Sequence, residues 1–254
     1  MAKDAKSAFC EDSRVKFPTL MHLMGMGFKY VSLKGLKTKY VEAPKTEFDP
    51  LTNILTDYFT DAYCTLNPKA EKKDAEDMLV KIQKSLQNDD LGRQFYNEIL
   101  LNTGERIIDL SSPANFYRNN TFQVTTEMSC GSKDSDNYRP DITIFVNGLP
   151  LAFIEVKKEN NHKGIQAETD RMKQRFVNPQ YRRFLNITQI MVFSNDMEYD
   201  NNEVTPTIGA FYATIGKKNT KYNCFREEGQ DSFPTARHIH QVTPEEEEVL
   251  LRDN

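Results

Sequence analysis

Apolar residues recur at spacings of three and four along the N-terminal half of the chain, a period typical of helices that bury one face. Asp49 or Thr52 is expected to cap the second helix, and Asp89 or Asp90 the fourth. We interpret the apolar stripes as core packing, so residues 1–110 are predicted to be mainly helical. The four segments that show this period are 12–27, 51–66, 70–86 and a stretch that ends near residue 100.

After residue 120 the hydrophobic period changes to two. Residues 122–128 alternate apolar and polar side chains, which is typical of a half-buried strand. Two short apolar runs follow at 142–146 and 151–156, and the Asn-Gly pair between them is a strong hairpin signal. This order predicts a mixed α/β sheet flanked by helices on both faces, with a helical N-terminal part. The remaining predicted elements are a helix at 162–176 and strands at 187–194 and 208–215.

The composition is that of an ordinary globular protein, with 38% apolar and 28% charged residues in 254. We expect one α/β domain over residues 1–215 and a polar linker over 216–254. No apolar run approaches the roughly 18 residues of a membrane span. Residues 1–16 are charged throughout and lack the apolar segment of a secretory signal, so none is expected.

Four cysteines without CxxC spacing argue against a zinc knuckle and for reduced thiols, hence a cytoplasmic location. The formal net charge is −4, so a site for a polyanion such as DNA has to be a local patch. The densest basic stretch is 157–183, with eight Lys and Arg against three Asp and Glu. We expect it to bind phosphates without reading bases, the alternative being a solvated helix face.

Asp141, Glu155 and Lys157 interrupt runs that are otherwise suited to a sheet interior. Burying a charged side chain is costly unless it is paired or binds a metal. Glu155 and Lys157 are two residues apart, so they project from one face of a strand. Asp141 joins them only if the hairpin has a three-residue loop, 147–149, or a bulge, because a strict two-residue loop turns it to the other face.

Two carboxylates brought that close repel each other, and a hard divalent cation removes the conflict. Mg²⁺ is the expected ion, with Mn²⁺ as an alternative, held by Asp141, Glu155 and the backbone carbonyl of Val156. The ion would activate water and stabilise charge on a pentacovalent phosphorane, while Lys157 would orient that water or stabilise that charge. These residues predict metal-assisted phosphodiester hydrolysis. The alternative is a hairpin in which the three groups form solvent-exposed ion pairs.

Pro140-Asp141 followed by Glu155-Val156-Lys157 resembles the PD-(D/E)xK nuclease motif. The full string at 139–157, RPDITIFVNGLPLAFIEVK, is similar to the N-terminal nuclease domain of the restriction (R) subunit of type I restriction–modification enzymes. The resemblance covers most of residues 10–215. Three further segments agree with it: EDSRVKFP at 11–18, NNTFQV at 119–124 and NITQIMVFSN at 186–195.

This resemblance implies a restriction-endonuclease-like fold with its catalytic sheet at 120–215. It implies that Asp141 and Glu155 are metal ligands, that Lys157 is the catalytic lysine, and that the substrate is double-stranded DNA. Cutting would be sequence-nonspecific at the cut site, and recognition would come from partner specificity and methylation subunits. ATP and S-adenosylmethionine would be needed only in the full enzyme.

Glu11 matches another acidic position of many such nucleases, although a glutamate in the first turn of a helix also complements the helix dipole. One departure is the absence of a Gln-xxx-Tyr pair on the helix after the lysine, for which Gln166 or Gln174, with Phe176, is the candidate substitute. The residues expected to contact DNA are Lys158, Lys163, Gln166, Arg171, Lys173 and Arg175.

Full R subunits of this family carry an ATP-driven translocase, but the chain contains no GxxxxGK[ST] phosphate loop. We therefore expect an N-terminal piece of such a subunit or a truncated gene product. The leading hypothesis is the endonuclease domain of a type I enzyme. The alternatives are a free-standing nuclease of the same fold and a catalytically silent DNA-binding or assembly module. The acidic tail counts against the first alternative, and the intact acidic and lysine residues count against the second.

Overall fold

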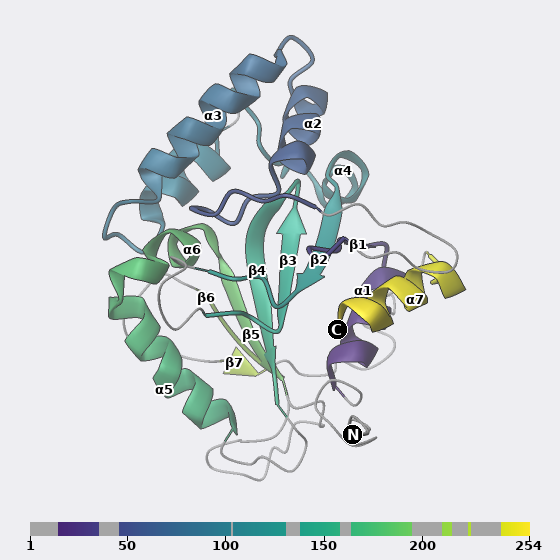
Figure 1. Ribbon diagram of the computed structural model, residues 1–254. Helices are drawn as coiled ribbons and strands as arrows, with labels where there is room; N and C mark the ends of the chain where they lie inside the picture. The colour runs from purple at the N-terminus through teal and green to yellow at the C-terminus, as the bar shows by residue number, and fades with distance from the viewer. Residues whose placement is uncertain are drawn as a thin grey trace.

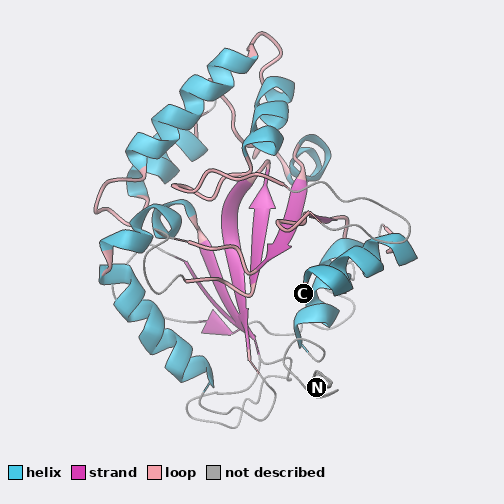
Figure 2. Cartoon of the chain, in the orientation of Figure 1, coloured by secondary structure: helices cyan, strands magenta, loops and turns pink. Residues whose placement is uncertain are grey.

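Seven strands form one sheet at the centre of the chain, with helices around it (Figure 1, Figure 2). The computed structural model describes residues 15–35, 46–102, 104–130, 138–157, 164–194, 210–214, 223–224 and 240–254. The first two strands pair in parallel, as do the fourth and fifth, and all other neighbours are antiparallel. In chain order, which is also their order in the sheet, the strands are β1 (Lys29–Tyr30), β2 (Phe122–Thr126), β3 (Ile142–Val146), β4 (Leu149–Val156), β5 (Ile190–Ser194), β6 (Ala210–Thr214) and β7 (Asn223–Cys224).

Helices cover both faces of this sheet, so the prediction of a mixed α/β sheet flanked by helices is confirmed. On one face, α1 and α7 pack against Ile142 and Ile154. On the other face, α5 and α6 pack against Phe153 and Phe193. The described helices are α1 (Phe17–Gly25), α2 (Thr56–Leu66), α3 (Lys72–Ser85), α4 (Pro113–Asn119), α5 (Gly164–Val177), α6 (Arg182–Ile187) and α7 (Pro244–Asp253), with a π-helical segment at Phe95–Leu100 and a 3-10 turn at Pro179–Tyr181.

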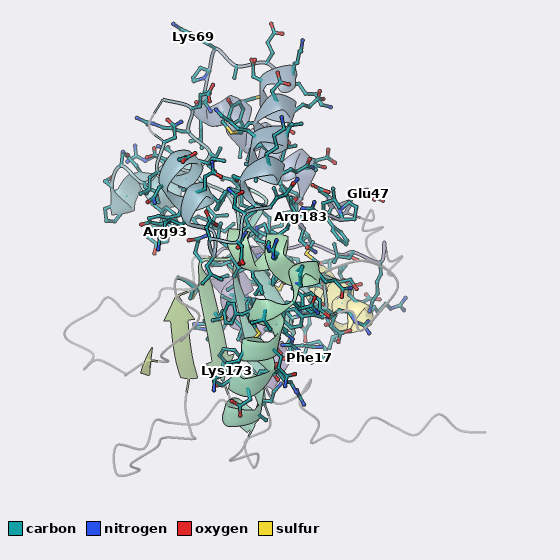
Figure 3. The ribbon with its side chains drawn as sticks, turned by 90° about the vertical axis from the view of Figure 1, so that its left-hand side faces the viewer. Phe17, Glu47, Lys69, Arg93, Lys173 and Arg183 are labelled. Carbon is teal, nitrogen blue, oxygen red and sulfur yellow. The ribbon has the colours of Figure 1, made fainter. Side chains whose placement is uncertain are left out.

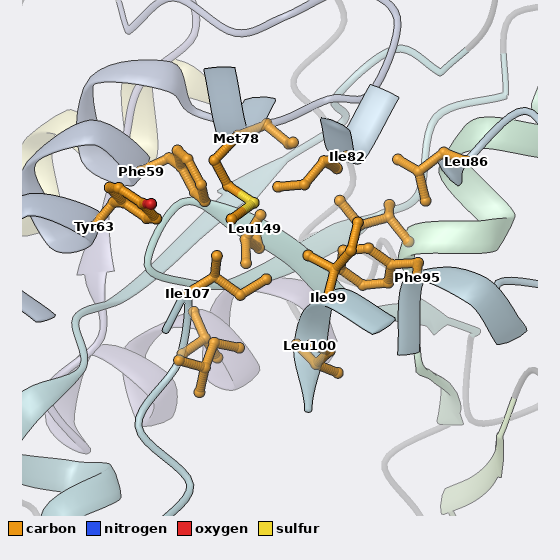
Figure 4. Packing of buried hydrophobic residues seen from close by; sticks show 14 of the residues in the cluster. Phe59, Tyr63, Met78, Ile82, Leu86, Phe95, Ile99, Leu100, Ile107 and Leu149 are labelled. Atoms are coloured by element: carbon orange, nitrogen blue, oxygen red, sulfur yellow. The ribbon is translucent and has the colours of Figure 1, made fainter. Parts of the chain in front are cut away.

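A third apolar cluster lies where β4 begins. Side chains from α2, α3 and the π-helical segment surround Leu149, as Figure 4 shows. The stripes predicted in the N-terminal half are therefore core packing. The buried members of this third cluster include Met78 and Ile82 on α3 and Phe95 on the π-helical segment, with exposed fractions of 4% or less.

The β3–β4 hairpin sets the register of the central strands. It turns through Asn147 and Gly148, both at positive φ (53° and 75°), as a two-residue loop. The register then shifts by one residue at a bulge beside Ile144. Because of this shift, Asp141 and Glu155 stand level with each other across the two strands. The bulge, one of the two alternatives that the chemistry required, is the one that the structure has.

The helical part of the chain holds this turn in place. The buried Asn147 amide donates to the Ile107 carbonyl at 2.9 Å and to Asn120 Oδ1 at 2.8 Å. The Leu55 N–H donates to the Gly148 carbonyl at 2.9 Å. Through these hydrogen bonds the turn is docked onto the segments before α2 and before β2.

Both predicted helix caps are wrong. Asp49 and Thr52 do not cap α2; the Asp49 carboxylate instead accepts hydrogen bonds from the Leu51 N–H and the Thr52 hydroxyl, which closes a turn ahead of the helix. Asp89 and Asp90 do not cap the next helical segment either, because its N-cap is Gln94. The Asp90 carboxylate instead accepts hydrogen bonds from the Gly92 N–H at 3.0 Å and the Gln94 N–H at 2.9 Å.

The range 216–254, which was expected to be a linker, contains regular structure in its described parts: residues 223–224 form β7, and a helix lies within residues 240–254. There the chain forms α7, and Leu250 is fully buried against the α1 side of the core. Thr243 and Glu246 form a capping box at its start, and acidic residues fill its first turn. The run of glutamates thus marks the N-terminus of a helix, in a segment that was predicted to be part of a polar linker.

Two short helices were not predicted from the sequence. One is α4, a helix of seven residues that is capped by Ser112 and has no apolar stripe. The strand expected from residue 187 begins at 190, because residues 182–187 form α6.

Gly148 is expected to be required for this hairpin. A Cβ there would lie 2.5 Å from the Leu55 carbonyl oxygen and 2.8 Å from the Phe59 nitrogen, at a φ that disfavours side chains. Gly148→Ala should lower the free energy of unfolding by about 2–4 kcal/mol, from strain and overpacking together. The control is Gly104→Ala, whose Cβ would meet nothing closer than 3.4 Å. Denaturant unfolding of both variants measures the difference, and equal losses would contradict the role given to the turn.

Candidate active site

Asp141, Glu155 and Lys157 converge at the end of the β3–β4 hairpin opposite its turn. The Lys157 Nζ atom lies 4.0 Å from Asp141 Oδ2 and 3.9 Å from Glu155 Oε2. The Glu155 side chain is 6% exposed, that of Lys157 14% and that of Asp141 26%. The alternative of solvent-exposed ion pairs is therefore wrong, because the cluster is largely buried and opens to solvent on the Asp141 side.

Backbone groups of β4 fix two of these side chains. The Asp141 carboxylate accepts a hydrogen bond from the Val156 N–H at 2.8 Å. The Lys157 ammonium donates to the Val156 carbonyl at 2.8 Å. The Lys157 N–H in turn donates to the Ser194 carbonyl, which ties the end of β4 to β5. The strand that supplies Glu155 thus also positions its two charged neighbours.

Tyr138 holds the Glu155 carboxylate from the other side. Its hydroxyl donates to Glu155 Oε1 at 2.6 Å, and the phenol is buried. Burial raises the pKa of Glu155 to about 8, and the negative charges of Asp141 and Glu168 act in the same direction. The Tyr138 hydrogen bond and the Lys157 charge lower that pKa in part. Burial and the two neighbouring carboxylates therefore outweigh the two groups that favour the charged form of Glu155.

Glu168, which the sequence reading counted only as a charge against the basic patch, belongs to this cluster. It comes from α5, its side chain is 1% exposed, and its Oε2 lies 3.7 Å from Lys157 Nζ. Arg171 and Arg175 each contact the Glu168 carboxylate at 2.8 Å. The sequence did contain an indication of this position. Glu168 precedes the buried Met172 by four residues, so both lie on the helix face turned toward the sheet.

The predicted DNA contacts divide between two faces of α5. Arg175 is turned inward, with its guanidinium 3.8 Å from the centre of the Tyr138 ring and its side chain 20% exposed. Arg171 and Lys173 are exposed, at 62% and 57% of their side chains, and Figure 3 shows Lys173 on the outer side of α5. Gln166 lies on α5, but its side chain is outside the described residues, as are Lys158, Lys163 and Glu11.

The donor set suits a hard cation. Asp141 and Glu155 offer carboxylate oxygens and Val156 a backbone carbonyl, the ligand types that Mg²⁺ prefers, with water and substrate oxygens completing its shell. A cation would also relieve the repulsion that raises the Glu155 pKa. Within the described residues, no group of three or more His, Cys, Asp or Glu side chains is arranged to hold a metal. The ligands on offer are thus two carboxylates and a carbonyl.

The chain is an α/β domain whose mixed sheet presents a buried acidic cluster with one lysine at a partly open edge. A family model described as type I restriction enzyme R protein N terminus matches residues 9–204. Since that match covers most of the chain, the protein belongs to this family. In the described part of the chain, no helix has both the length and the apolar character needed to cross a membrane.

Curated relatives agree with the family. The endonuclease subunit of type I restriction enzyme SauCOLORF180P from Staphylococcus aureus strain COL is 30% identical to the chain over 108 residues. The corresponding subunit of SauMRSORF196P from strain MRSA252 matches to the same extent. The matched stretch is 41% of this chain and 11% of each relative, so the chain spans a small part of the length of these subunits.

Metal-free protein should lose stability as the pH rises, because of Glu155. Its carboxyl group has a pKa of about 8 in the folded chain against an ordinary value of 4.5, so the folded state holds a proton that the unfolded state releases. The stabilising contribution is complete below about pH 4.5 and is lost as the pH rises through about 8. Melting temperatures in chelator should fall over this range, and less so for Glu155→Gln. Equal slopes for the two proteins would contradict the raised pKa.

Proposed function

We propose that the chain is the metal-dependent endonuclease domain of a type I restriction enzyme R subunit, and that it hydrolyses phosphodiester bonds of double-stranded DNA. One observation carries the proposal: Asp141, Glu155 and Lys157 meet at one point, with the lysine within 4.0 Å of both carboxylates. The assignment to the PD-(D/E)xK fold is part of the proposal. The names of the curated relatives, which are endonuclease subunits, support it.

Mg²⁺, or Mn²⁺ in its place, is the cofactor in this proposal. Asp141, Glu155 and the Val156 carbonyl would hold the ion, which when bound supplies charge stabilisation to the phosphate and activates water. Glu155 has to give up its proton for this, so metal affinity is expected to rise with pH. The Tyr138 hydroxyl, which donates to Glu155 Oε1, leaves Oε2 on the side of Lys157.

The chain's own groups supply the rest of the reaction. The Lys157 ammonium is suited to orient the attacking water or to stabilise negative charge on the phosphorus oxygens, as a compact point charge. The partial exposure of Asp141 leaves an approach to the cluster for a phosphate of the DNA backbone. The buried side of the cluster excludes water, which strengthens every electrostatic contact within it.

In this proposal the DNA backbone lies along the exposed side of α5, where Arg171 and Lys173 bind phosphates. Sequence recognition, and with it S-adenosylmethionine, would belong to specificity and methylation subunits, and ATP to a translocase outside this chain. These partners follow from the family alone.

Removal of the buried acid tests the reaction. Glu155→Gln should lower Mg²⁺-dependent cleavage of plasmid DNA by at least about a hundredfold, because a ligand and its charge are lost. The matched control is Glu76→Gln, an exposed carboxylate on α3, which should cut like the unaltered protein. Supercoiled plasmid, with and without chelator, measures the loss in the chain and in the subunit complex that contains it.

The outcomes separate the candidate functions. Cleavage that survives Glu155→Gln contradicts the site. Salt-sensitive DNA binding without cleavage in any assembly favours the silent module instead. Full cutting by the chain without partner subunits favours a free-standing nuclease of the same fold.

Lys173 and Arg175 provide a matched pair for DNA binding. Lys173→Ala should weaken binding of every duplex alike and reduce the slope of log affinity against log salt by about one, because one phosphate contact is lost. Arg175→Ala should leave that slope unchanged, since its guanidinium faces Glu168 and Tyr138. Fluorescence anisotropy over a salt series measures both. Equal slopes for Lys173→Ala and the unaltered protein would contradict the proposal that DNA binds along this side of α5.

A further inference from the structure

Lys157 is surrounded by three carboxylates, and they do not come from the same element. Asp141 and Glu155 belong to the β3–β4 hairpin, at 4.0 and 3.9 Å from its Nζ atom. Glu168 reaches it from α5 and is the nearest of the three, at 3.7 Å. The orientation of the Lys157 ammonium therefore depends on which of the three carboxylates stays negatively charged and is not bound to another cation.

A bound cation changes this balance. Asp141, Glu155 and the Val156 carbonyl are the groups proposed as its ligands, and the last of these now accepts a hydrogen bond from Lys157 at 2.8 Å. Once those oxygens face a cation, they no longer attract the ammonium, and the cation itself repels it. Glu168, which comes from α5 and is not among those ligands, keeps its negative charge within 3.7 Å of Lys157 Nζ.

The Glu168 carboxylate is itself held rigidly. Arg175 contacts its Oε1 atom and Arg171 its Oε2 atom, each at 2.8 Å. Arg175 also lies over the ring of Tyr138, whose hydroxyl holds Glu155. Glu168 is therefore connected to Glu155 through the side chains of Arg175 and Tyr138. Arrangements of this kind fix a functional group without loss of further side-chain entropy when the reaction occurs.

We propose that Glu168 is a positioning residue for Lys157: it holds the ammonium over the acidic pair from the α5 side and is not itself a metal ligand. The inference rests on the proposed function in assigning Lys157 to the reaction. The contact between the two side chains is testable without it.

The first test needs no cleavage. The metal-free chain is treated with a limiting amount of an acetylating reagent, and each lysine is quantified by peptide mass spectrometry. Glu168→Gln should raise the labelling rate of Lys157 about tenfold, the change expected when one charge-assisted contact is lost. Lys81, an exposed lysine on α3 paired with Glu105, should label at an unchanged rate.

The matched control is Asp170→Asn, which removes an acid from the same helix and breaks an exposed ion pair with Lys173 at 2.8 Å. It should leave Lys157 labelling unchanged. If Glu168→Gln loses its thermal transition, Glu168→Asp takes its place, because it keeps the charge for the arginines but withdraws the carboxylate by one methylene. An unchanged labelling rate in the folded variant overturns the proposal.

Metal binding separates a positioning residue from a ligand. Calorimetric titration with Mn²⁺ should give Glu168→Gln an affinity within about twofold of the unaltered protein, because every proposed ligand remains, while Glu155→Gln loses a carboxylate ligand and most of the affinity. An equal loss in both makes Glu168 a ligand and overturns the proposal. Binding that survives Glu155→Gln contradicts the proposed metal site and leaves the labelling result to stand alone.

Where the assembly cuts DNA, a double-mutant cycle completes the test. Glu168→Gln should lower kcat about tenfold with KM for DNA within about twofold, and should cost nothing further in a Lys157→Ala background. Glu168→Asp should recover part of the loss. Additive losses in the double variant would show that Glu168 does not act through Lys157.

Discussion

The burial of the Glu155 carboxylate is the constraint on which the rest of the site depends. A carboxylate that is 6% exposed costs several kcal/mol unless neighbouring groups compensate it. Tyr138 donates a hydrogen bond to it, and Lys157 brings an ammonium to 3.9 Å. The negative charges of the nearby Asp141 and Glu168 act the other way and, together with burial, raise the pKa of Glu155 above its ordinary value. A divalent ion beside these oxygens would favour the charged form of Glu155, which makes the site suited to a cation.

The backbone of the hairpin creates this arrangement and the helical part of the chain maintains it. Without the bulge beside Ile144, a two-residue turn would send Asp141 and Glu155 to opposite faces of the sheet. The turn itself is held by hydrogen bonds from the buried Asn147 amide and to the Gly148 carbonyl. A displaced turn would slide β3 along β4 and separate the carboxylates at the far end. The N-terminal helices therefore contribute to the site although none of the acidic cluster comes from them.

The sequence predicted what depends on local pattern and missed what depends on tertiary partners. Strand periodicity located β3 and nearly all of β4, and the spacing of Glu155 and Lys157 placed both on one face. It left the loop length open, because one residue more or less in a hairpin changes little in the local pattern. Glu168 was overlooked because a single acid among many helix charges shows its role only when the sheet beneath it is known. For the same reason the residues of α7 were predicted to be part of a linker, because the burial of Leu250 depends on α1.

The basic residues of α5 do not all face solvent, so the helix does not present all of its positive charge to DNA. Along the sequence, the segment from 157 to 183 carries a surplus of basic residues. In the structure, Arg175 is neutralised inward by Glu168, Arg171 shares the same carboxylate, and Lys173 pairs with Asp170. Within α5 itself, Arg171, Lys173 and Arg175 stand against Glu168 and Asp170, so this helix carries a smaller surplus of positive charge than the whole segment 157–183. An arrangement of this kind favours modest DNA affinity at the site itself.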